Sequence, residues 1–143
     1  MRNLLSRLAV LAMLLAGLLD SSAQANQDSR RVWKIGILWH AANLEQEAVM
    51  FEPFARGMHE LGYVEGQNLV LEHTFVDENF DLFDSRAREL LDRKVDLILA
   101  SNGPAAAAAA KATKTVPIVF ATSGDPLKLG LIESFRRPGA NVT

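Results

Sequence analysis

The stretch VDLILASNGPAAAAAAKATKTVPIVFATSGDP, residues 95–126, decides the fold because it contains one structural unit twice. A short apolar run, residues 95–100, leads into the polar loop 101–103, a proline and a run of alanines. A second apolar run, residues 118–121, leads into the polar loop 122–125 and again a proline. Such runs are typical of parallel strands buried on both faces, and proline suits the first turn of a helix because its missing N–H would have no partner there. The stretch predicts two strand–loop–helix units side by side in a parallel sheet.

The remainder of the sequence continues this alternation. Apolar runs predict further strands at residues 32–39 and 69–75. Apolar residues at the spacing of one helix face, together with the alanine run, predict helices at residues 44–61, 80–93, 104–113 and 126–135. The order is therefore β-α-β-α-β-α-β-α. With right-handed crossovers it indicates an α/β fold with a doubly wound parallel sheet in strand order 2-1-3-4.

Three residues bear on the first helix. Pro53 interrupts its pattern, so either a turn precedes a helix that begins at Pro53, or a longer helix kinks there. Gly62 is expected to end the helix in the left-handed conformation, with Tyr63 folding back on the last turn.

The candidate binding site consists of residues that follow the strands. In such a sheet, ligands bind outside the carboxyl ends of the strands, and the predicted order brings the loops 40–43 and 101–103 together there. The candidate ligand-binding residues are Trp39, His40, Ser101, Asn102, Gly103, Thr122, Ser123 and Asp125. The helix N-terminus after residues 101–103 favours a carboxylate, although the same polar residues also suit loops and helix caps.

Three of these candidates have definite structural alternatives. His40 can be simply an exposed loop histidine, and Trp39 can plug the end of the sheet. Asp125 precedes Pro126 and stands at a helix N-cap, where a carboxylate accepts hydrogen bonds from the first-turn amides.

The N-terminal part of the sequence has the features of an export signal. Two arginines precede a twelve-residue apolar run, residues 8–19, and a small-x-small cleavage site ends at Ala25. A bilayer-spanning helix needs about 20 apolar residues, so a membrane anchor is the less favoured alternative. We expect a signal peptide at residues 1–25, a flexible lead-in at 26–31, and one lobe at 32–143. Export without any cysteine indicates a periplasmic protein that is neither disulfide-stapled nor lipid-anchored.

Composition and motifs argue against several functions. With 15 basic and 17 acidic residues the net charge is −2, which does not favour nucleic-acid binding. The loop 39–43 contains no glycine, so the dinucleotide fingerprint is absent, and neither a P-loop nor a glycine-flanked nucleophilic serine is present. Nothing in the sequence gives His59 or His73 a metal-binding partner. We therefore expect no enzyme activity, no cofactor and no metal site.

Several stretches resemble one family. They are residues 60–68, 95–98, 104–106, 117–126 and 137–143. Together they look like the N-terminal lobe of the periplasmic substrate-binding proteins of ABC importers, whose type 1 binding-protein fold has two flavodoxin-like lobes joined by a hinge. Characterised members bind aromatic amino acids such as tryptophan. The resemblance covers nearly all of the sequence after the leader, and it implies that the C-terminal lobe is missing.

The resemblance implies a function and roles for two residues. The chain would capture a small, amino-acid-like solute in the periplasm and deliver it to an ABC permease and its ATPase. Ser101 would meet the ligand's carboxylate and Asp125 its ammonium group. A single lobe is expected to bind the ligand weakly or undetectably. The alternatives are an extracytoplasmic ligand-sensing domain that signals to a membrane partner, a small α/β enzyme, and a truncated, non-functional fragment.

Overall fold

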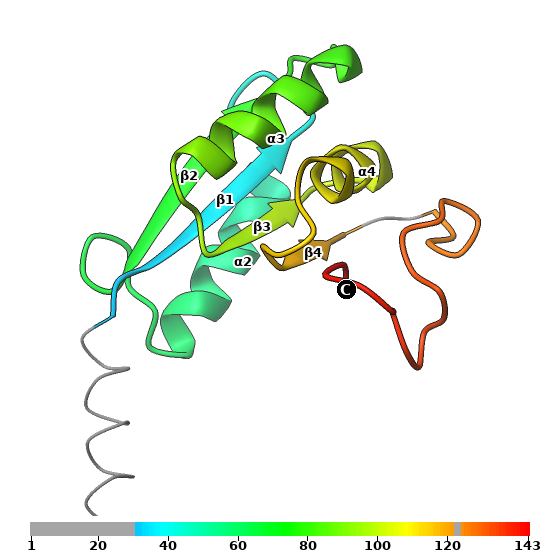
Figure 1. Ribbon diagram of the computed structural model, residues 1–143. Helices are drawn as coiled ribbons and strands as arrows, with labels where there is room; N and C mark the ends of the chain where they lie inside the picture. Colours follow the sequence, from blue (N-terminus) through cyan, green and yellow to red (C-terminus); the bar gives the residue numbers. More distant parts are fainter. Residues whose placement is uncertain (1–30, 122–123) are drawn as a thin grey trace, which may run out of the picture. The chain divides into compact units, whose positions relative to one another are not determined.

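Four parallel strands form the centre of the computed structural model, which describes residues 31–121 and 124–143 (Figure 1). The elements, in chain order, are β1 (Trp33–Trp39), α2 (Ala48–Glu60), β2 (Leu69–Phe75), η1 (Phe80–Leu82), α3 (Phe83–Asp92), β3 (Leu97–Ala100), α4 (Gly103–Ala112) and β4 (Ile118–Phe120). The stretch from Val32 to Thr143 is one compact unit. This is the α/β architecture that the sequence predicts.

The strand order is β2-β1-β3-β4, as predicted. Ile35 of β1 lies between Leu71 of β2 and Leu97 of β3, and Ile98 of β3 is paired with Ile118 of β4. Beyond β4, Val142 forms a parallel bridge with Ile118. All strands run in the same direction, so their carboxyl ends meet at one edge of the sheet.

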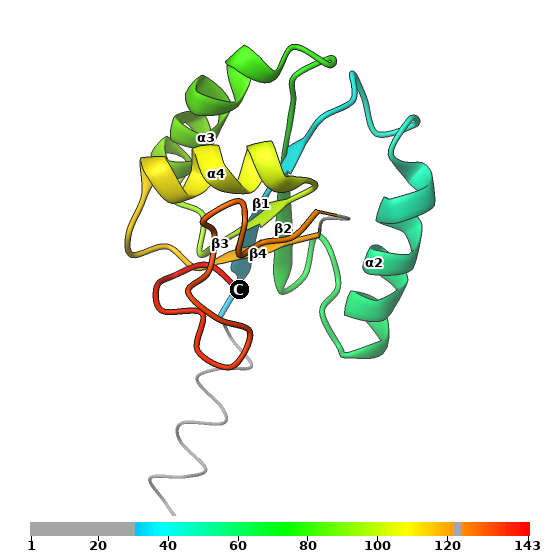
Figure 2. The ribbon, with the colours of Figure 1, turned by 90° about the vertical axis from the view of Figure 1, so that its right-hand side faces the viewer.

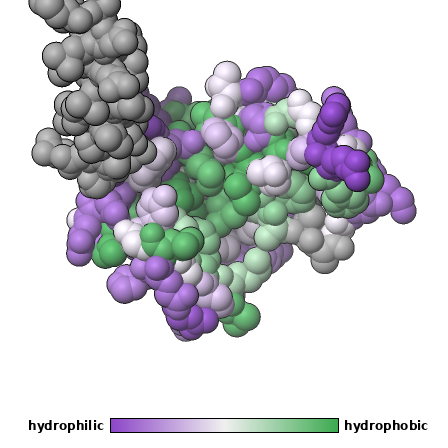
Figure 3. Space-filling model, turned by 90° about the horizontal axis from the view of Figure 1, so that it is seen from below, coloured by the Kyte–Doolittle hydropathy of each residue, from purple (hydrophilic) through white to green (hydrophobic). Residues whose placement is uncertain are grey.

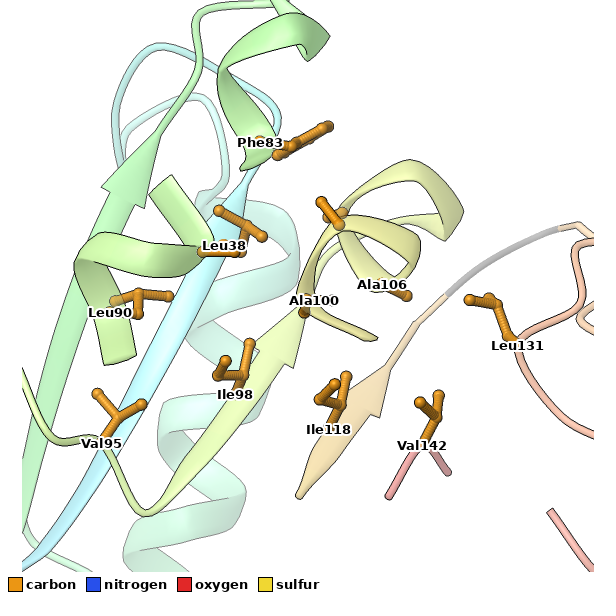
Figure 4. Packing of buried hydrophobic residues seen from close by; sticks show 14 of the residues in the cluster. Leu38, Phe83, Leu90, Val95, Ile98, Ala100, Ala106, Ile118, Leu131 and Val142 are labelled. Carbon is orange, nitrogen blue, oxygen red and sulfur yellow. The ribbon is translucent and has the colours of Figure 1, made fainter. Parts of the chain in front are cut away.

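Helices cover the two faces of the sheet unequally. Figure 2 shows the sheet edge-on, with α3 and α4 on one side and α2 on the other. Buried residues of the α3 and α4 side include Leu38, Leu90, Ile98 and Ile118, which point toward one another between the sheet and these helices (Figure 4). Along β1 the side chains alternate, so that Ile37 packs on the α2 side.

Helix α2 contains Pro53 within its length rather than at its start. The helix begins at Ala48 and not at residue 44, because residues 44–47 form a turn before it. It ends as predicted: Gly62 has φ +87°, its N–H donates to His59 O at 2.9 Å, and the N–H of Tyr63 donates to Met58 O at 2.9 Å. These two hydrogen bonds form a Schellman motif.

The predicted helix at 126–135 is wrong, because the chain makes only a single turn there. The N–H of Gly130 donates to Leu127 O at 3.1 Å and that of Leu131 to Pro126 O at 3.0 Å. With Gly130 at φ +66°, this is again a Schellman motif. Gly130 therefore ends the helix one turn after Pro126 begins it. The side chain of Leu131 is buried in the core.

None of the helices within residues 31–121 and 124–143 combines the length and the hydrophobicity that a membrane span requires.

Candidate functional site

The loops after β1 and β3 begin side by side at the carboxyl edge of the sheet. Leu38 is the register partner of Ala100, and the N–H of Ser101 donates to Leu38 O at 3.1 Å. On the other side of β3, the N–H of Ala121 donates to Ala100 O at 3.0 Å. The segments that follow β1, β3 and β4 are thus neighbours, in the order that the sequence analysis expects.

Ser101 carries a buried polar atom without a partner. The residue is 8% exposed, and its Oγ makes no hydrogen bond to any described part of the chain. A buried polar group left unpaired costs about 1–3 kcal/mol, so this hydroxyl is available to a partner outside the described residues. A hydroxyl can donate to a carboxylate, which is the ligand group predicted here.

The N-terminus of α4 lies directly after Ser101. Asn102 is extended (φ −156°, ψ 176°) and is the N-cap, with its Oδ1 accepting a hydrogen bond from the N–H of Ala105 at 2.8 Å. Gly103 is buried and begins the helix. Pro104 has no N–H, and the N–H of Ala105 is already bonded to Asn102. Few N–H groups of the first turn are therefore left for a ligand. Asn102 therefore has a structural role, and Ser101 offers the unsatisfied group.

The loop after β1 is held by a buried carboxylate, Glu47, which the sequence analysis did not single out. The Glu47 side chain is 2% exposed; its Oε1 accepts a hydrogen bond from the N–H of Ala41 at 3.2 Å and lies 2.9 Å from His40 Nδ1. No sequence signal distinguishes it from neighbouring acids such as the exposed Glu45.

The loop after β2 is bonded to the loop after β1. Asp77 and Glu78 have φ of 49° and 58°, left-handed values that are uncommon for residues other than glycine. Their N–H groups donate to Ala41 O at 3.1 Å and His40 O at 2.8 Å. His40 Nε2 lies 3.9 Å from Glu78 Oε1. His40 is thus placed between two acidic side chains at the carboxyl edge.

Trp39 is buried on the α2 side of the sheet. Its Nε1 donates to His73 Nδ1 at 2.9 Å, and its ring is nearly parallel to the His73 ring and edge-on to that of Phe51. Burial lowers the pKa of His73, against smaller opposing effects of Glu65 and Glu72. The indole therefore fills the space between β1, β2 and α2, as in the structural alternative given for it.

Asp125 is the N-cap of the single turn after β4. Its Oδ1 accepts hydrogen bonds from the N–H groups of Leu127 at 3.0 Å and Lys128 at 3.4 Å. The carboxylate remains partly exposed, with Lys128 Nζ 4.0 Å from Oδ2. Thr122 and Ser123 lie outside the described residues.

A separate cavity of about 430 Å³ lies on the α2 side. Its lining is almost wholly apolar and consists of Trp33, Ile35, Phe54, Met58, Tyr63, Asp96, Leu97, Leu99, Pro117 and Val119. Seen from below, the surface shows hydrophobic side chains gathered in its middle and hydrophilic ones around them (Figure 3). The cavity includes none of the predicted site residues, and its chemistry does not suit a dipolar headgroup.

Across residues 31–121 and 124–143, no group of three or more His, Cys, Asp or Glu side chains is arranged to hold a metal ion.

Known proteins resemble this chain. Residues 40–143 match the family described as ABC transporter substrate binding protein. The chain is 29% identical to the tyrosine-binding protein of Clostridioides difficile strain R20291, in an alignment covering 94% of this chain and 43% of that protein.

Two solved structures have the same fold. One is the ligand-free, open structure of a substrate-binding protein with adhesive properties from Clostridium difficile, with a TM-score of 0.70 and 32% identity, covering 78% of this chain and 38% of that one. The other is an ABC domain from Streptococcus pneumoniae in complex with L-Trp, with a TM-score of 0.70 and 26% identity, covering 78% and 37%.

This chain thus spans about two fifths of the length of these relatives. They match its α/β lobe with the parallel four-stranded sheet. Because the family match extends over residues 40–143, well over half of the sequence, the chain belongs to the ABC transporter substrate-binding protein family.

Proposed function

We propose that this chain is the first lobe of a substrate-binding protein of an ABC importer, and that it captures a small, amino-acid-like solute at the carboxyl edge of its sheet. The family match and the two relatives named for tyrosine and L-Trp support this proposal over a sensing domain. The observation that carries it is the buried Oγ of Ser101 at that edge, which has no hydrogen-bond partner among residues 31–121 and 124–143.

The proposed ligand orientation follows from the groups at the edge. Ser101 Oγ donates to the ligand's carboxylate, beside the positive end of α4. Asp125 is the acid that the resemblance assigns to the ammonium group. Its Oδ1 already serves as a cap, so a ligand would share the carboxylate with the first-turn amides.

The mechanism is closure of two lobes around the solute. A ligand that contacts both lobes favours the closed state by its differential affinity for it, and no bond of the ligand is made or broken. This chain corresponds to about two fifths of its relatives, so it supplies only part of those contacts. We expect dissociation constants in the millimolar range, which correspond to binding energies of about −4 kcal/mol.

The proposed setting is the periplasm. Residues 1–25 would direct export and be removed; they lie outside the described residues, as does most of the lead-in at 26–31. The partners would be an ABC permease and its ATPase, to which the closed form delivers its solute. Neither nucleic acid nor a cofactor has a part in this function.

The experiment is a titration of the chain with L-tryptophan, followed by NMR, in the parent and in Ser101→Ala. Loss of the donor at the carboxylate should weaken binding at least about tenfold, since hydrogen bonds to charged groups contribute about 1.5–3 kcal/mol and 1.4 kcal/mol corresponds to tenfold. Ser85→Ala is the control, because Ser85 is exposed and its Oγ donates to the carbonyl of Leu82, the N-cap residue of α3. Equal affinities of the parent and Ser101→Ala would contradict the assignment.

A further inference from the structure

The segment that follows β4 carries large apolar side chains on its outside. Leu131 is buried in the core, whereas Leu127 is 42% exposed, Leu129 48% and Phe135 74%. Single exposed apolar residues are ordinary on a protein surface, but three of them in so short a stretch form a group. Transfer of these side chains from water into an apolar phase is favourable.

Phe135 stands at the tip of a loop that hydrogen bonds close. The N–H of Glu133 donates to Pro138 O at 3.0 Å. Within the loop, Ser134 Oγ accepts from the N–H of Arg137 at 3.0 Å and donates to the carbonyl of the same residue at 3.0 Å. These bonds fix the backbone on both sides of Phe135 and hold its side chain outside the core.

The same end of the lobe is basic, although the rest of it is acidic. Residues 31–121 contain 9 basic and 13 acidic residues, whereas residues 124–143 contain three basic and two acidic ones. The three basic side chains are all exposed and belong to Lys128, Arg136 and Arg137. Positive charge is therefore concentrated where the apolar side chains are exposed.

Basic and apolar side chains alternate along this segment. Lys128 separates Leu127 from Leu129, and Arg136 follows Phe135 directly. In the part of the chain that the structure describes, neither arginine of the tip forms an ion pair. This combination suits the surface of an anionic bilayer, where cations meet the headgroups and apolar side chains enter the boundary of the acyl chains.

The arrangement of the segment favours a lipid surface over a protein groove. Its two turns protrude at the β4 end of the sheet, and both face the viewer in Figure 2. The exposed apolar side chains are divided between these turns, and none of them lines the cavity beside α2. A protein would need a separate complementary pocket for each turn, whereas a bilayer accepts both without one.

We propose that residues 127–137 bind the surface of an anionic lipid bilayer, with Phe135 entering the interface and Arg136 and Arg137 meeting the phosphate groups. The inference goes beyond the proposed function and does not depend on the identity of the ligand. Because the remainder of the lobe is acidic, the same surface repels it, so the contact also orients the lobe with its β4 end toward the bilayer. Each arginine near such a surface strengthens binding by about fivefold.

Sedimentation with lipid vesicles tests this site. The protein used is residues 26–143, because the apolar run at 8–19 would itself bind lipid, and Val32–Thr143 is a compact unit of its own. Vesicles of phosphatidylcholine and phosphatidylglycerol in equal amounts should bind the protein at least about tenfold better than phosphatidylcholine alone, and about 0.5 M sodium chloride should remove the difference. Equal binding to both vesicles, or to neither, would overturn the proposal.

A pair of charge variants locates the contact. Arg136→Gln combined with Arg137→Gln should weaken binding to the anionic vesicles at least about tenfold, since two charges are lost. Arg56→Gln combined with Arg88→Gln is the matched control, because both arginines are exposed on other elements, α2 and α3. An equal loss in the two double variants would mean that binding follows net charge and would overturn the site.

The apolar contribution is tested in the same assay. Phe135→Ala should weaken binding to the anionic vesicles by about fivefold or more, since a large apolar side chain no longer enters the interface. Leu61→Ala is the control of similar exposure, 76% against 74%. Both positions are exposed, so the thermal midpoints should stay at the parent value. Unchanged binding in Phe135→Ala would contradict the entry of the tip into the bilayer.

A fluorescent label shows which side of the lobe meets the lipid. The chain contains no cysteine, so Leu129→Cys and Leu61→Cys each provide one site for a polarity-sensitive dye. With anionic vesicles the emission of the dye at position 129 should shift to the blue, and that at position 61 should not. A shift at position 61 without one at 129 would show that another face binds and would overturn the proposal.

Discussion

The backbone N–H of Ser101 donates to the carbonyl of Leu38 across 3.1 Å, and this bond sets the loop after β3 directly beside the loop after β1. Among the described residues it is the last backbone hydrogen bond between β1 and β3 before the two loops separate. The polar side chains of both loops therefore share one edge of the sheet. Ser101 and His40 follow adjacent strands, and the N–H of Glu78 donates to the carbonyl of His40, although these residues lie in separate parts of the sequence.

Ser101→Ala should not destabilise the protein. The substitution removes a buried hydroxyl that makes no hydrogen bond within the described structure, so the free energy of unfolding should stay the same or rise by up to about 1–2 kcal/mol. Urea unfolding followed by circular dichroism measures this. A loss of more than 1 kcal/mol would mean that the hydroxyl has an internal partner and is not reserved for a ligand.

Gly36→Ala should cost about 1–3 kcal/mol of stability, the usual range for overpacking a core. A Cβ at this position would lie 3.0 Å from both Cδ atoms of Leu90 and 3.1 Å from Val95 Cγ1. Gly57→Ala is the matched control within α2, since a Cβ there meets nothing within 4 Å. It should stabilise by about 0.5–1 kcal/mol. Similar thermal midpoints for the two variants would contradict this packing of α3 against β1.

Asn102→Ala should lower the free energy of unfolding by about 1 kcal/mol, because α4 loses the side chain that accepts from the N–H of Ala105. Asn102→Asp keeps a capping oxygen and should remain close to the parent. Chemical denaturation of the three proteins checks this order. If Asp were as destabilising as Ala, the capping account of Asn102 would fail.

His73 should make stability fall as the pH drops below the ordinary histidine pKa of about 6.5. Burial lowers the pKa of His73 in the folded state, so the unfolded state binds a proton more readily. The contribution is complete above the unfolded value of about 6.5 and is lost as the pH falls from there toward the lowered folded value. His73→Gln should flatten this part of the stability profile. Urea unfolding at a series of pH values measures the profile, and an unchanged profile in His73→Gln would contradict this account.

Much of the fold could be predicted because its signals are local. The apolar runs, the left-handed Gly62 and the proline-led alanine helix each act within a few residues, and handedness rules supply the strand order. The missing helix at 126–135 shows the limit of such signals. Gly130 stops the helix after one turn. The spacing of apolar residues does not reveal that the hydrogen bonds from Gly130 and Leu131 end the helix so early.

The site was less predictable because its contacts join distant loops. Ser101 and His40 could be placed at the carboxyl edge from strand order alone. The importance of Glu47 depends on its burial, and that of Glu78 on hydrogen bonds between the loops after β1 and β2. Neither property leaves a mark in the sequence. The apolar cavity beside α2 could not be predicted either, because it depends on how much of the sheet this helix covers.

The most direct test of the central claim locates the bound solute on the lobe. In ¹H–¹⁵N spectra of the chain titrated with L-tryptophan, the account predicts the largest shifts at the amides of Ala41, Glu78 and Ser101, at the carboxyl edge. Largest shifts at Trp33, Met58 and Val119 would place the ligand in the apolar cavity and contradict the account.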